Sequence, residues 1–210
     1  MIISTDDYHY QSWKKISNKH GFIFNRELND NLSGVSRSES LKFILKYNNM
    51  NIDEKTFSSM LQEKNRIYRS LLSNLNRNSV FKGTIDLVED LKRYEIKVGI
   101  GSSSKNARYI LEKIELLDTF DAIIDGTNIA NSKPDPEVFT KCADLLQIDY
   151  KECLVIEDAE AGIIAALKAN MKVIGIGKRL SNIVKHYYNS LRELDYETIR
   201  IIFNLKEEIQ

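Results

Sequence analysis

The sequence predicts an α/β protein in which a helical domain precedes a doubly wound parallel sheet. Three observations support this prediction. Up to about residue 76 the apolar residues recur at helical spacing, and after about residue 80 short, continuous apolar runs alternate with amphipathic segments. Polar residues capable of chemistry follow three of those runs, and ligands bind at the carboxyl ends of the strands in folds of this kind.

The first part of the chain is expected to form a helical domain over residues 1–80, with residues 1–5 as a hinge. The Gly-Val-Ser-Arg segment at 34–37 interrupts the pattern and is predicted to be a loop, with Ser36 or Ser38 as the N-cap of the following helix. The apolar residues at helical spacing in this domain include Trp13, Ile16, Leu41, Ile44, Leu45, Ile67, Leu71 and Leu72.

Residues 81–210 are expected to form the α/β core. Runs that are apolar on both faces predict parallel strands covered by helices on each side. The predicted strands are 96–100, 122–124, 154–156 and 173–176, and the predicted helices are 85–91, 107–117, 138–146 and 163–167.

The composition excludes several classes of protein. Hydrophobic residues make up 42% of the 210 residues and charged ones 29%, which are globular values, and 30 basic residues balance 30 acidic ones. This balance of charge gives no net positive electrostatic field that would attract nucleic acid. An anionic ligand therefore has to be bound by a few basic residues close to it. The N-terminus lacks the pattern of a secretory signal, and no run approaches the ~18 apolar residues of a membrane span. We expect a cytoplasmic monomer with two buried, reduced thiols, Cys142 and Cys153.

The polar residues after the predicted strands match the needs of phosphoryl transfer. The transferred group carries negative charge on its equatorial oxygens, so a catalyst needs fixed donors, a cation, a metal ion and a nucleophile. Ser102 and the backbone amides after it would donate to those oxygens, and Lys133 would neutralise them. Glu157 and Asp158 supply hard oxygen ligands suited to Mg²⁺.

Each of these residues also has a purely structural interpretation. A serine-rich turn or an aspartate after a strand often caps the next helix, and a lysine before proline is usually solvated. Taken alone, Arg37 could equally be a solvated arginine or a phosphate ligand, whereas His9 would be interpreted as a surface histidine. The order of the blocks and their shared position at strand ends favour the functional interpretation.

These blocks resemble the haloacid dehalogenase superfamily and, within it, the β-phosphoglucomutases. Ser102 matches the second motif of the superfamily, Lys133 the third, and the Glu157-Asp158 pair the fourth, and the likeness runs from Met1 to about Ile176. Phosphatases of the superfamily share those motifs. The narrower resemblance depends on four short segments, which are Asp7 to Trp13, Leu32 to Arg37, Lys64-Asn65 and Ser102 to Ala107.

The resemblance implies that the helical domain is a cap, which closes over the core around a small-molecule sugar phosphate. Arg37 would grip the phosphate that is not transferred, and Lys64 would reach the substrate from the cap. The implied catalytic residues are Ser102, Lys133 and His9, and Glu157 and Asp158 would hold Mg²⁺. The implied substrate-binding residues are Trp13, Gly34, Val35, Ser36, Arg37, Lys64, Ser103, Ser104, Lys105 and Asn106.

The resemblance also implies a first strand that ends in Asp-x-Asp ahead of Met1, and the printed sequence does not contain it. The first aspartate would accept the phosphoryl group, and the second would be the general acid and base. We interpret the difference as a mistaken start site or a truncation, and we expect the chain as printed to be inactive. The missing strand would be central in the sheet, so a gap there would leave two strand edges unpaired.

Three functions fit the sequence. The leading one is the Mg²⁺-dependent interconversion of β-glucose 1-phosphate and glucose 6-phosphate through an aspartyl phosphate. In the second, a sugar-phosphate phosphatase of the same superfamily, water takes the phosphoryl group. The third is a non-catalytic pseudoenzyme that binds sugar phosphates.

Overall fold

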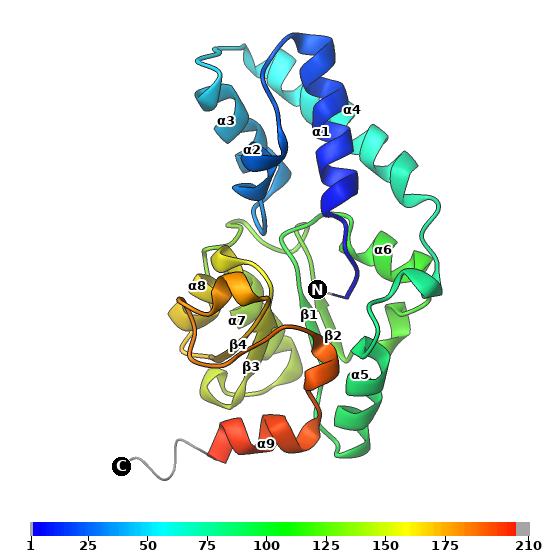
Figure 1. The fold of residues 1–210 in the computed structure, drawn as a ribbon, viewed down its shortest axis with the longest axis vertical. Coiled ribbons are helices and arrows are strands. Elements are labelled where there is room, and N and C mark those ends of the chain that lie inside the picture. The colour runs from blue at the N-terminus through cyan, green and yellow to red at the C-terminus, as the bar shows by residue number, and fades with distance from the viewer. Residues whose placement is uncertain (1, 205–210) are drawn as a thin grey trace.

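The computed structural model describes residues 2–204, with a helical unit at one end and an α/β unit at the other (Figure 1). No helix within these residues has both the length and the apolar character needed to cross a lipid bilayer. In chain order the elements are α1 (Asp6–His20), α2 (Arg26–Asp30), α3 (Arg37–Tyr47), α4 (Glu54–Leu72), α5 (Thr84–Arg93), β1 (Gly99–Gly101), α6 (Ala107–Lys113), β2 (Ala122–Ile124), α7 (Glu137–Leu146), β3 (Leu154–Glu157), α8 (Glu160–Lys168), β4 (Lys172–Ile176), β5 (Tyr187–Tyr188) and α9 (Tyr196–Asn204), with short 3₁₀ turns between some of them.

The helical unit consists of α1–α4, and local sequence sets where its helices begin and end. Asn25, Ser36 and Asp53 are the N-caps of α2, α3 and α4, and each side chain accepts a hydrogen bond from a backbone N–H of the first turn. Helix α1 ends at Gly21, whose left-handed conformation (φ 73°) turns the chain. The apolar cluster that these helices bury includes Trp13, Ile16, Phe24, Leu41, Ile44 and Met60.

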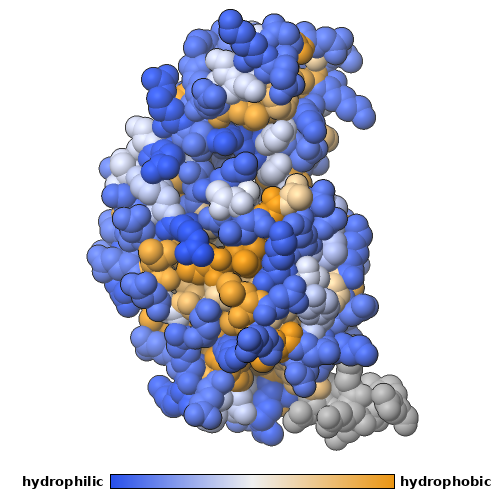
Figure 2. All heavy atoms as spheres, turned by 180° about the vertical axis from the view of Figure 1, so that it is seen from behind, coloured by the Kyte–Doolittle hydropathy of each residue, from blue (hydrophilic) through white to orange (hydrophobic). Residues whose placement is uncertain are grey.

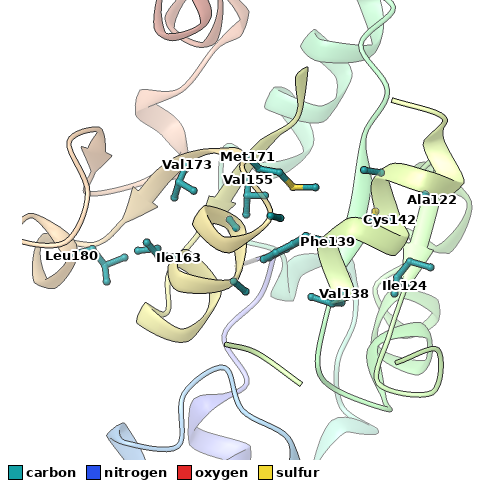
Figure 3. Packing of buried hydrophobic residues seen from close by; sticks show 14 residues of the cluster. Ala122, Ile124, Val138, Phe139, Cys142, Val155, Ile163, Met171, Val173 and Leu180 are labelled. Carbon is teal, nitrogen blue, oxygen red and sulfur yellow. The ribbon is translucent and has the colours of Figure 1, made fainter. Parts of the chain in front are cut away.

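Every strand pair in the described part of the chain is parallel, and helices cover both faces, which confirms the predicted doubly wound architecture. β1 pairs with β2, while β3 pairs with β4 and β4 with β5. On one face, α7 and α8 share an apolar cluster with β2, β3 and β4 (Figure 3). On the other face, α6 packs against β1 and β2, and α5 and α9 pack against β3 and β4.

The strands of residues 2–204 form two separate sheets, one of two strands and one of three. A cavity of about 1690 Å³ is lined by every residue of β1 and of β3, and it also reaches residues of the helical unit. The α/β unit is therefore built from two half-sheets with a cavity between them, and the cavity extends to the carboxyl ends of the strands.

Some element boundaries differ from the predicted ones. The first strand begins only at Gly99, because the Asp121 carboxylate, in place of a backbone carbonyl, accepts the hydrogen bond from the Val98 N–H (2.7 Å). Helix α6 ends at Lys113 because the chain turns at Glu115, which has a positive φ of 59°. β5 and α9 have no predicted counterpart. Cys142 is buried as predicted, which raises its pKa to about 11, whereas Cys153 is only half-buried.

Candidate active site

The turn between β1 and α6 carries Ser102 at the carboxyl end of β1. Its N–H donates to the Ile124 carbonyl of β2 (3.0 Å), which holds the residue in the sheet. Its hydroxyl accepts from the Ser104 N–H (3.2 Å), and the Ser104 hydroxyl accepts from the Asn106 N–H (3.2 Å). The two hydroxyls therefore order the turn that leads into α6, as the structural interpretation expects, and Ser102 also lines the cavity at the end of β1.

Lys133 bridges the carboxyl ends of the two half-sheets. Its side chain is 6% exposed, and Nζ donates to the Gly101 carbonyl at the end of β1 (3.1 Å) and forms an ion pair with Glu157 at the end of β3. Its backbone N–H also donates to the Ser103 hydroxyl (3.3 Å). A buried charge is tolerated when it is paired, so this lysine is not the solvated residue of the structural interpretation.

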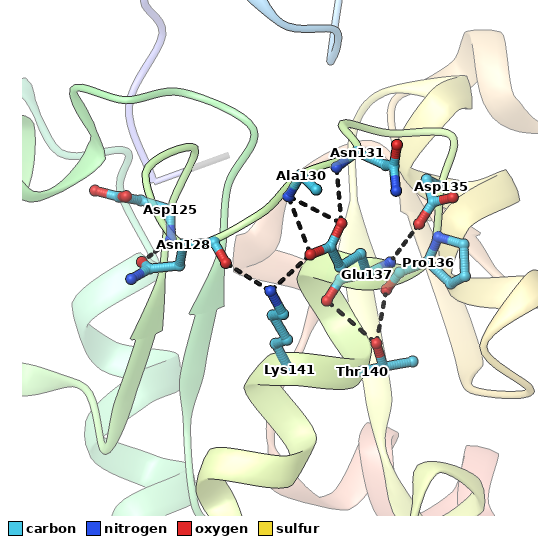
Figure 4. A network of polar contacts seen from close by, with 9 residues as sticks. All are labelled: Asp125, Asn128, Ala130, Asn131, Asp135, Pro136, Glu137, Thr140 and Lys141. Atoms are coloured by element: carbon cyan, nitrogen blue, oxygen red, sulfur yellow. Dashed lines mark hydrogen bonds and ion pairs between the residues drawn. The ribbon is translucent and has the colours of Figure 1, made fainter.

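A network around Glu137 holds the loop that carries Lys133 (Figure 4). The Glu137 carboxylate pairs with Lys141 (2.6 Å) and accepts hydrogen bonds from the N–H groups of Ala130 (3.0 Å) and Asn131 (2.7 Å). These contacts, of which the one with Lys141 is the largest, lower the pKa of Glu137 to about 2. The loop is therefore tied to the first turn of α7.

Glu157 uses both carboxylate oxygens within the protein. Oε1 pairs with Lys133, and Oε2 accepts from the N–H groups of Asp158 (3.0 Å) and Ala159 (3.3 Å). The residue as a whole is 7% exposed. Its geometry is that of a residue that positions Lys133 and the turn after β3, whereas the sequence analysis treated it as a metal ligand.

Gly162 of α8 allows the helix to pack directly against Glu157. A Cβ atom at this position would lie 2.2 Å from Glu157 Cδ. We predict that Gly162→Ala displaces the carboxylate from Lys133 and lowers the free energy of unfolding by about 1–3 kcal/mol, as overpacking usually does. Urea unfolding measures the change. In a Glu157→Ala background the same substitution has nothing to displace and should cost far less, so an equal cost in both backgrounds would contradict the prediction.

Asp6, the first residue of α1, also lines this cavity, although the sequence analysis assigned it no role. It lines the same cavity as Asp158, and its pKa is raised first by burial and then by the charge of Asp158. The available signal was its place in the sequence, directly before the segment that resembles the family. Acidic residues in the first turn of a helix are common because they complement the helix dipole, so this signal was weak.

The residues described do not complete a metal site by themselves. Nowhere in residues 2–204 do three His, Cys, Asp or Glu side chains gather closely enough to hold an ion. Glu157 is paired with Lys133, and the carboxylates of Asp6, Asp135 and Asp158 also line the cavity. Mg²⁺ binds through as few as one or two carboxylates and keeps several waters, so the donor chemistry fits the ion as a partial site.

Arg37 brings a buried hydrogen-bond donor to the cavity from the helical unit. It is the first residue of α3, directly after the N-cap Ser36, so it belongs to the helix and not to the predicted loop. Its Nη1 is buried and has no hydrogen-bond partner among the described residues, and burial lowers its pKa. A planar guanidinium without a protein acceptor suits the oxygens of a phosphate.

Lys64, which is buried, and His9, which is half-buried, form a pair near Arg37. Lys64 Nζ lies 2.9 Å from His9 Nδ1, and the lysine is 1% exposed. Burial lowers the pKa of Lys64 well below its usual value, and the charge of Arg37 adds to this effect. Burial also lowers the pKa of His9, followed by the charges of Lys64 and Arg37. The charges that act on this pair are positive, which makes this side of the cavity receptive to an anion.

The helical unit touches the α/β unit directly at the cavity. The Asn106 side-chain amide donates to Asn65 Oδ1 of α4 (2.9 Å). Gly34 has a positive φ of 81°, and a Cβ atom there would lie 3.1 Å from the Ala159 Cβ, so its loop packs closely on the turn after β3. Trp13 is 1% exposed and packs in the helical cluster, although it also lines the cavity.

Every site residue that the sequence analysis named lines this one cavity. From the helical unit come His9, Trp13, Gly34, Val35, Ser36, Arg37 and Lys64. From the α/β unit come Ser102, Ser103, Ser104, Lys105, Asn106, Lys133, Glu157 and Asp158. Hydroxyls, cations and carboxylates from separate strand ends therefore meet beneath the helical unit.

Comparison with known proteins agrees with this site. A family model described as haloacid dehalogenase-like hydrolase matches residues 1–176. The chain is 39% identical over 185 residues to a β-phosphoglucomutase of Bacillus subtilis, covering 85% of this chain and 80% of that protein. It is 26% identical over 179 residues to a fructose-1-phosphate phosphatase of Escherichia coli, with coverages of 83% and 90%.

Among solved structures, that of a β-phosphoglucomutase from Clostridium difficile superposes with a TM-score of 0.95 at 35% identity, covering 99% of this chain and 95% of that one. The family match spans most of the chain and includes the turn of Ser102, the loop of Lys133 and the end of β3. The chain therefore belongs to the haloacid dehalogenase-like hydrolases.

Proposed function

We propose that this protein is a β-phosphoglucomutase-type enzyme, which interconverts β-glucose 1-phosphate and glucose 6-phosphate with Mg²⁺. The observation that carries the proposal is that basic side chains line the cavity at two separate places. Arg37 and Lys64 lie on the helical side, and Lys133 lies at the strand ends beside Ser102. Two separate places for phosphate suit a reaction that passes through a sugar bisphosphate. The 39% identity to the Bacillus subtilis β-phosphoglucomutase supports the same assignment.

Each group has a role in this proposal. The Ser102 hydroxyl and the amides of its turn would donate to the transferring phosphoryl group. Lys133, fixed by Glu157 and the Gly101 carbonyl, would supply positive charge that needs no reorganisation during the reaction. Mg²⁺, held through Asp158, would supply further charge neutralisation. Arg37 would hold the other phosphate.

The proposed reaction needs a carboxylate nucleophile, which we assign to the first aspartate of an Asp-x-Asp strand that the printed sequence does not contain. We propose that the chain as printed binds sugar phosphate without turning it over.

The decisive test joins an apolar strand ending in Asp-x-Asp ahead of Met1 and measures the conversion of β-glucose 1-phosphate to glucose 6-phosphate. Isomerisation is expected from the joined protein in the presence of Mg²⁺ and not from the chain as printed. A joined protein with asparagine at both aspartate positions is the matched control. A joined protein that folds and binds the substrate but does not isomerise it would overturn the assignment.

A sugar-phosphate phosphatase is the second candidate, favoured by the 26% identity to the fructose-1-phosphate phosphatase of Escherichia coli. In that case, water takes the phosphoryl group. Release of inorganic phosphate, measured on the same joined protein, distinguishes the two functions, because fast hydrolysis without isomerisation identifies the phosphatase.

Lys64 gives a pH-dependent prediction for binding. The pKa of Lys64 in the folded protein lies well below its ordinary value of 10.5. At pH values between this lowered pKa and 10.5, the lysine of the unliganded protein is therefore mostly neutral. A bound phosphate dianion favours the charged ammonium and raises this pKa, so binding in that range should take up a proton. Above about pH 8 the phosphate itself no longer titrates.

Isothermal titration calorimetry with β-glucose 1-phosphate, in two buffers of different ionisation enthalpy above pH 8, measures the uptake of this proton on binding. The apparent binding enthalpy should differ between the buffers, and Lys64→Met should remove the difference. Lys19→Met, which changes an exposed lysine paired with Glu63, should leave it in place. Equal enthalpies in both buffers for the unchanged protein would contradict the prediction.

A further inference from the structure

Two tyrosine rings stack face to face where α5 ends and α9 begins. The rings of Tyr94 and Tyr196 have centroids 3.7 Å apart and planes inclined by only 9°. Carbon atoms in contact lie about 3.5–4.0 Å apart, so rings at this centroid distance overlap almost fully. Aromatic pairs usually prefer offset or edge-to-face arrangements with larger centroid distances. Within residues 2–204 this is the only ring contact between two tyrosines.

The ends of the two helices hold the rings in this arrangement. Tyr94 is the C-cap of α5, and its N–H donates to the Leu91 carbonyl (3.2 Å). Tyr196 is the first residue of α9, and its N–H donates to Oδ2 of Asp90 in α5 (3.0 Å). A side chain of α5 therefore fixes the start of α9 beside Tyr94, so the overlap of the rings is set by the backbone around them.

Apolar packing behind the rings keeps both helices in place. α5 and α9 lie at the same end of the molecule (Figure 1) and share a buried apolar cluster that contains Leu87, Leu91, Ile199 and Ile202. Seen from behind, the α/β half also has a band of hydrophobic side chains among mostly hydrophilic ones (Figure 2). A covalent link between α5 and α9 would therefore hold α9 on the apolar core that it helps to cover.

One ring of the pair is open to reagents in solution, and the other is reached through it. Tyr94 is 50% exposed, whereas Tyr196 is half-buried. Rings whose π systems overlap exchange an electron readily, so a radical formed on Tyr94 passes to Tyr196. Tyr94 is then available for a second oxidation, which places a radical on each ring.

We propose that Tyr94 and Tyr196 are the site of an oxidative dityrosine cross-link, formed with a peroxide that a haem peroxidase activates, which ties α9 to α5. Each phenol gives up one electron and one proton to become a phenoxyl radical. The two radicals join through a carbon–carbon bond between ring positions ortho to the oxygens, and the hydrogens on those carbons move to the oxygens. Hydrogen peroxide takes up the two electrons and two protons, its O–O bond breaks, and two water molecules leave.

The stack supplies the geometry that this coupling needs. Ring carbons of the two phenols already face one another at contact distance, so the new bond requires a short approach and no unfolding. Tyr47 and Tyr187 are 55% and 41% exposed, but neither has a ring contact with another tyrosine in the described part of the chain. Their radicals couple only when two molecules collide, so the link within one molecule forms first in dilute protein.

The link would also change the stability of the protein. It would close a loop of about 100 residues between Tyr94 and Tyr196, and a cross-link over a long loop stabilises the folded chain by restricting the unfolded one. The thermal midpoint of the linked protein should therefore rise by about 5 °C or more. The inference depends on the two helix ends and not on the proposed function.

The test treats the full chain, in dilute solution, with hydrogen peroxide and a haem peroxidase. Dityrosine is detected by its fluorescence, and mass spectrometry of a tryptic digest locates it. Trypsin releases residues 94–97 and residues 193–200 as separate peptides. We expect these two peptides joined, with the loss of two hydrogens, and most of the fluorescence in monomeric protein. Fluorescence confined to dimers, or a linked protein whose thermal midpoint is unchanged, would overturn the proposal.

Two matched variants show whether the stacked pair is the source of the link. Tyr94→Phe keeps the ring but removes the phenol oxygen, so it should abolish the fluorescence of the monomer and the rise in thermal midpoint. Tyr47→Phe changes a tyrosine of similar exposure and should leave both in place. Monomer fluorescence that persists in Tyr94→Phe, or is lost in Tyr47→Phe, would contradict the assignment. The assay uses no sugar phosphate, so its outcome and that of the mutase test are independent.

Discussion

Replacing Lys133 with methionine should lower the free energy of unfolding by about 3–5 kcal/mol, the usual cost of leaving a buried charge without its partner. The substitution keeps an apolar stem of similar length but removes the ammonium that bridges Glu157 and the Gly101 carbonyl. Glu157, at 7% exposure, would keep only the N–H groups of Asp158 and Ala159. Urea unfolding followed by circular dichroism measures the change.

Two further variants test whether the unpaired charge is the cause. Adding Glu157→Gln to Lys133→Met replaces the buried carboxylate with a neutral amide and should recover much of the loss. Lys42→Met removes the exposed lysine of the pair with Glu39, and such pairs contribute about 1 kcal/mol or less. If Lys133→Met costs no more than Lys42→Met, the bridge between the half-sheets does not contribute as argued.

The order of elements in the α/β unit could be predicted because strands covered on both faces are nearly all apolar. β2 matches its predicted range, and β3 and β4 each extend theirs by one residue. β5 could not be found in this way, because two residues show no periodicity. Apolar runs say nothing about which strands are neighbours, so the expectation of a central gap with two unpaired strand edges came from the resemblance alone. The backbone pairing of the described residues has two separate sheets.

The candidate site was predicted in part. Residues at the ends of parallel strands meet at one edge of a sheet, so Ser102, Lys133 and Glu157 could be expected together. The pairing of Lys133 with Glu157 depends on strand order and on burial, neither of which a local pattern contains. For the same reason, no local pattern indicates that Asp6 lies close enough to Asp158 for the charge of Asp158 to raise the pKa of Asp6.

Arg37→Ala is expected to weaken the binding of β-glucose 1-phosphate by about 10- to 100-fold, because hydrogen bonds between charged groups contribute about 1.5–3 kcal/mol. Isothermal titration measures the change. Arg37→Lys keeps the charge but loses the planar fork, so its loss should be intermediate. Arg26→Ala, which removes an exposed arginine paired with Asp7, should leave the affinity unchanged.

The same substitution should not destabilise the unliganded protein. Nη1 of Arg37 is buried without a partner among residues 2–204, and burial already disfavours its charge, so removing it relieves a cost of folding. If Arg37 is needed for packing, Arg37→Ala should lower both the stability of the protein and its affinity for the substrate. If Arg37 is needed only to bind an anion, the substitution should lower the affinity alone. Thermal unfolding of Arg37→Ala without ligand separates the two cases. A clear loss of stability with unchanged affinity would show that Arg37 supports the fold and that the phosphate is held elsewhere.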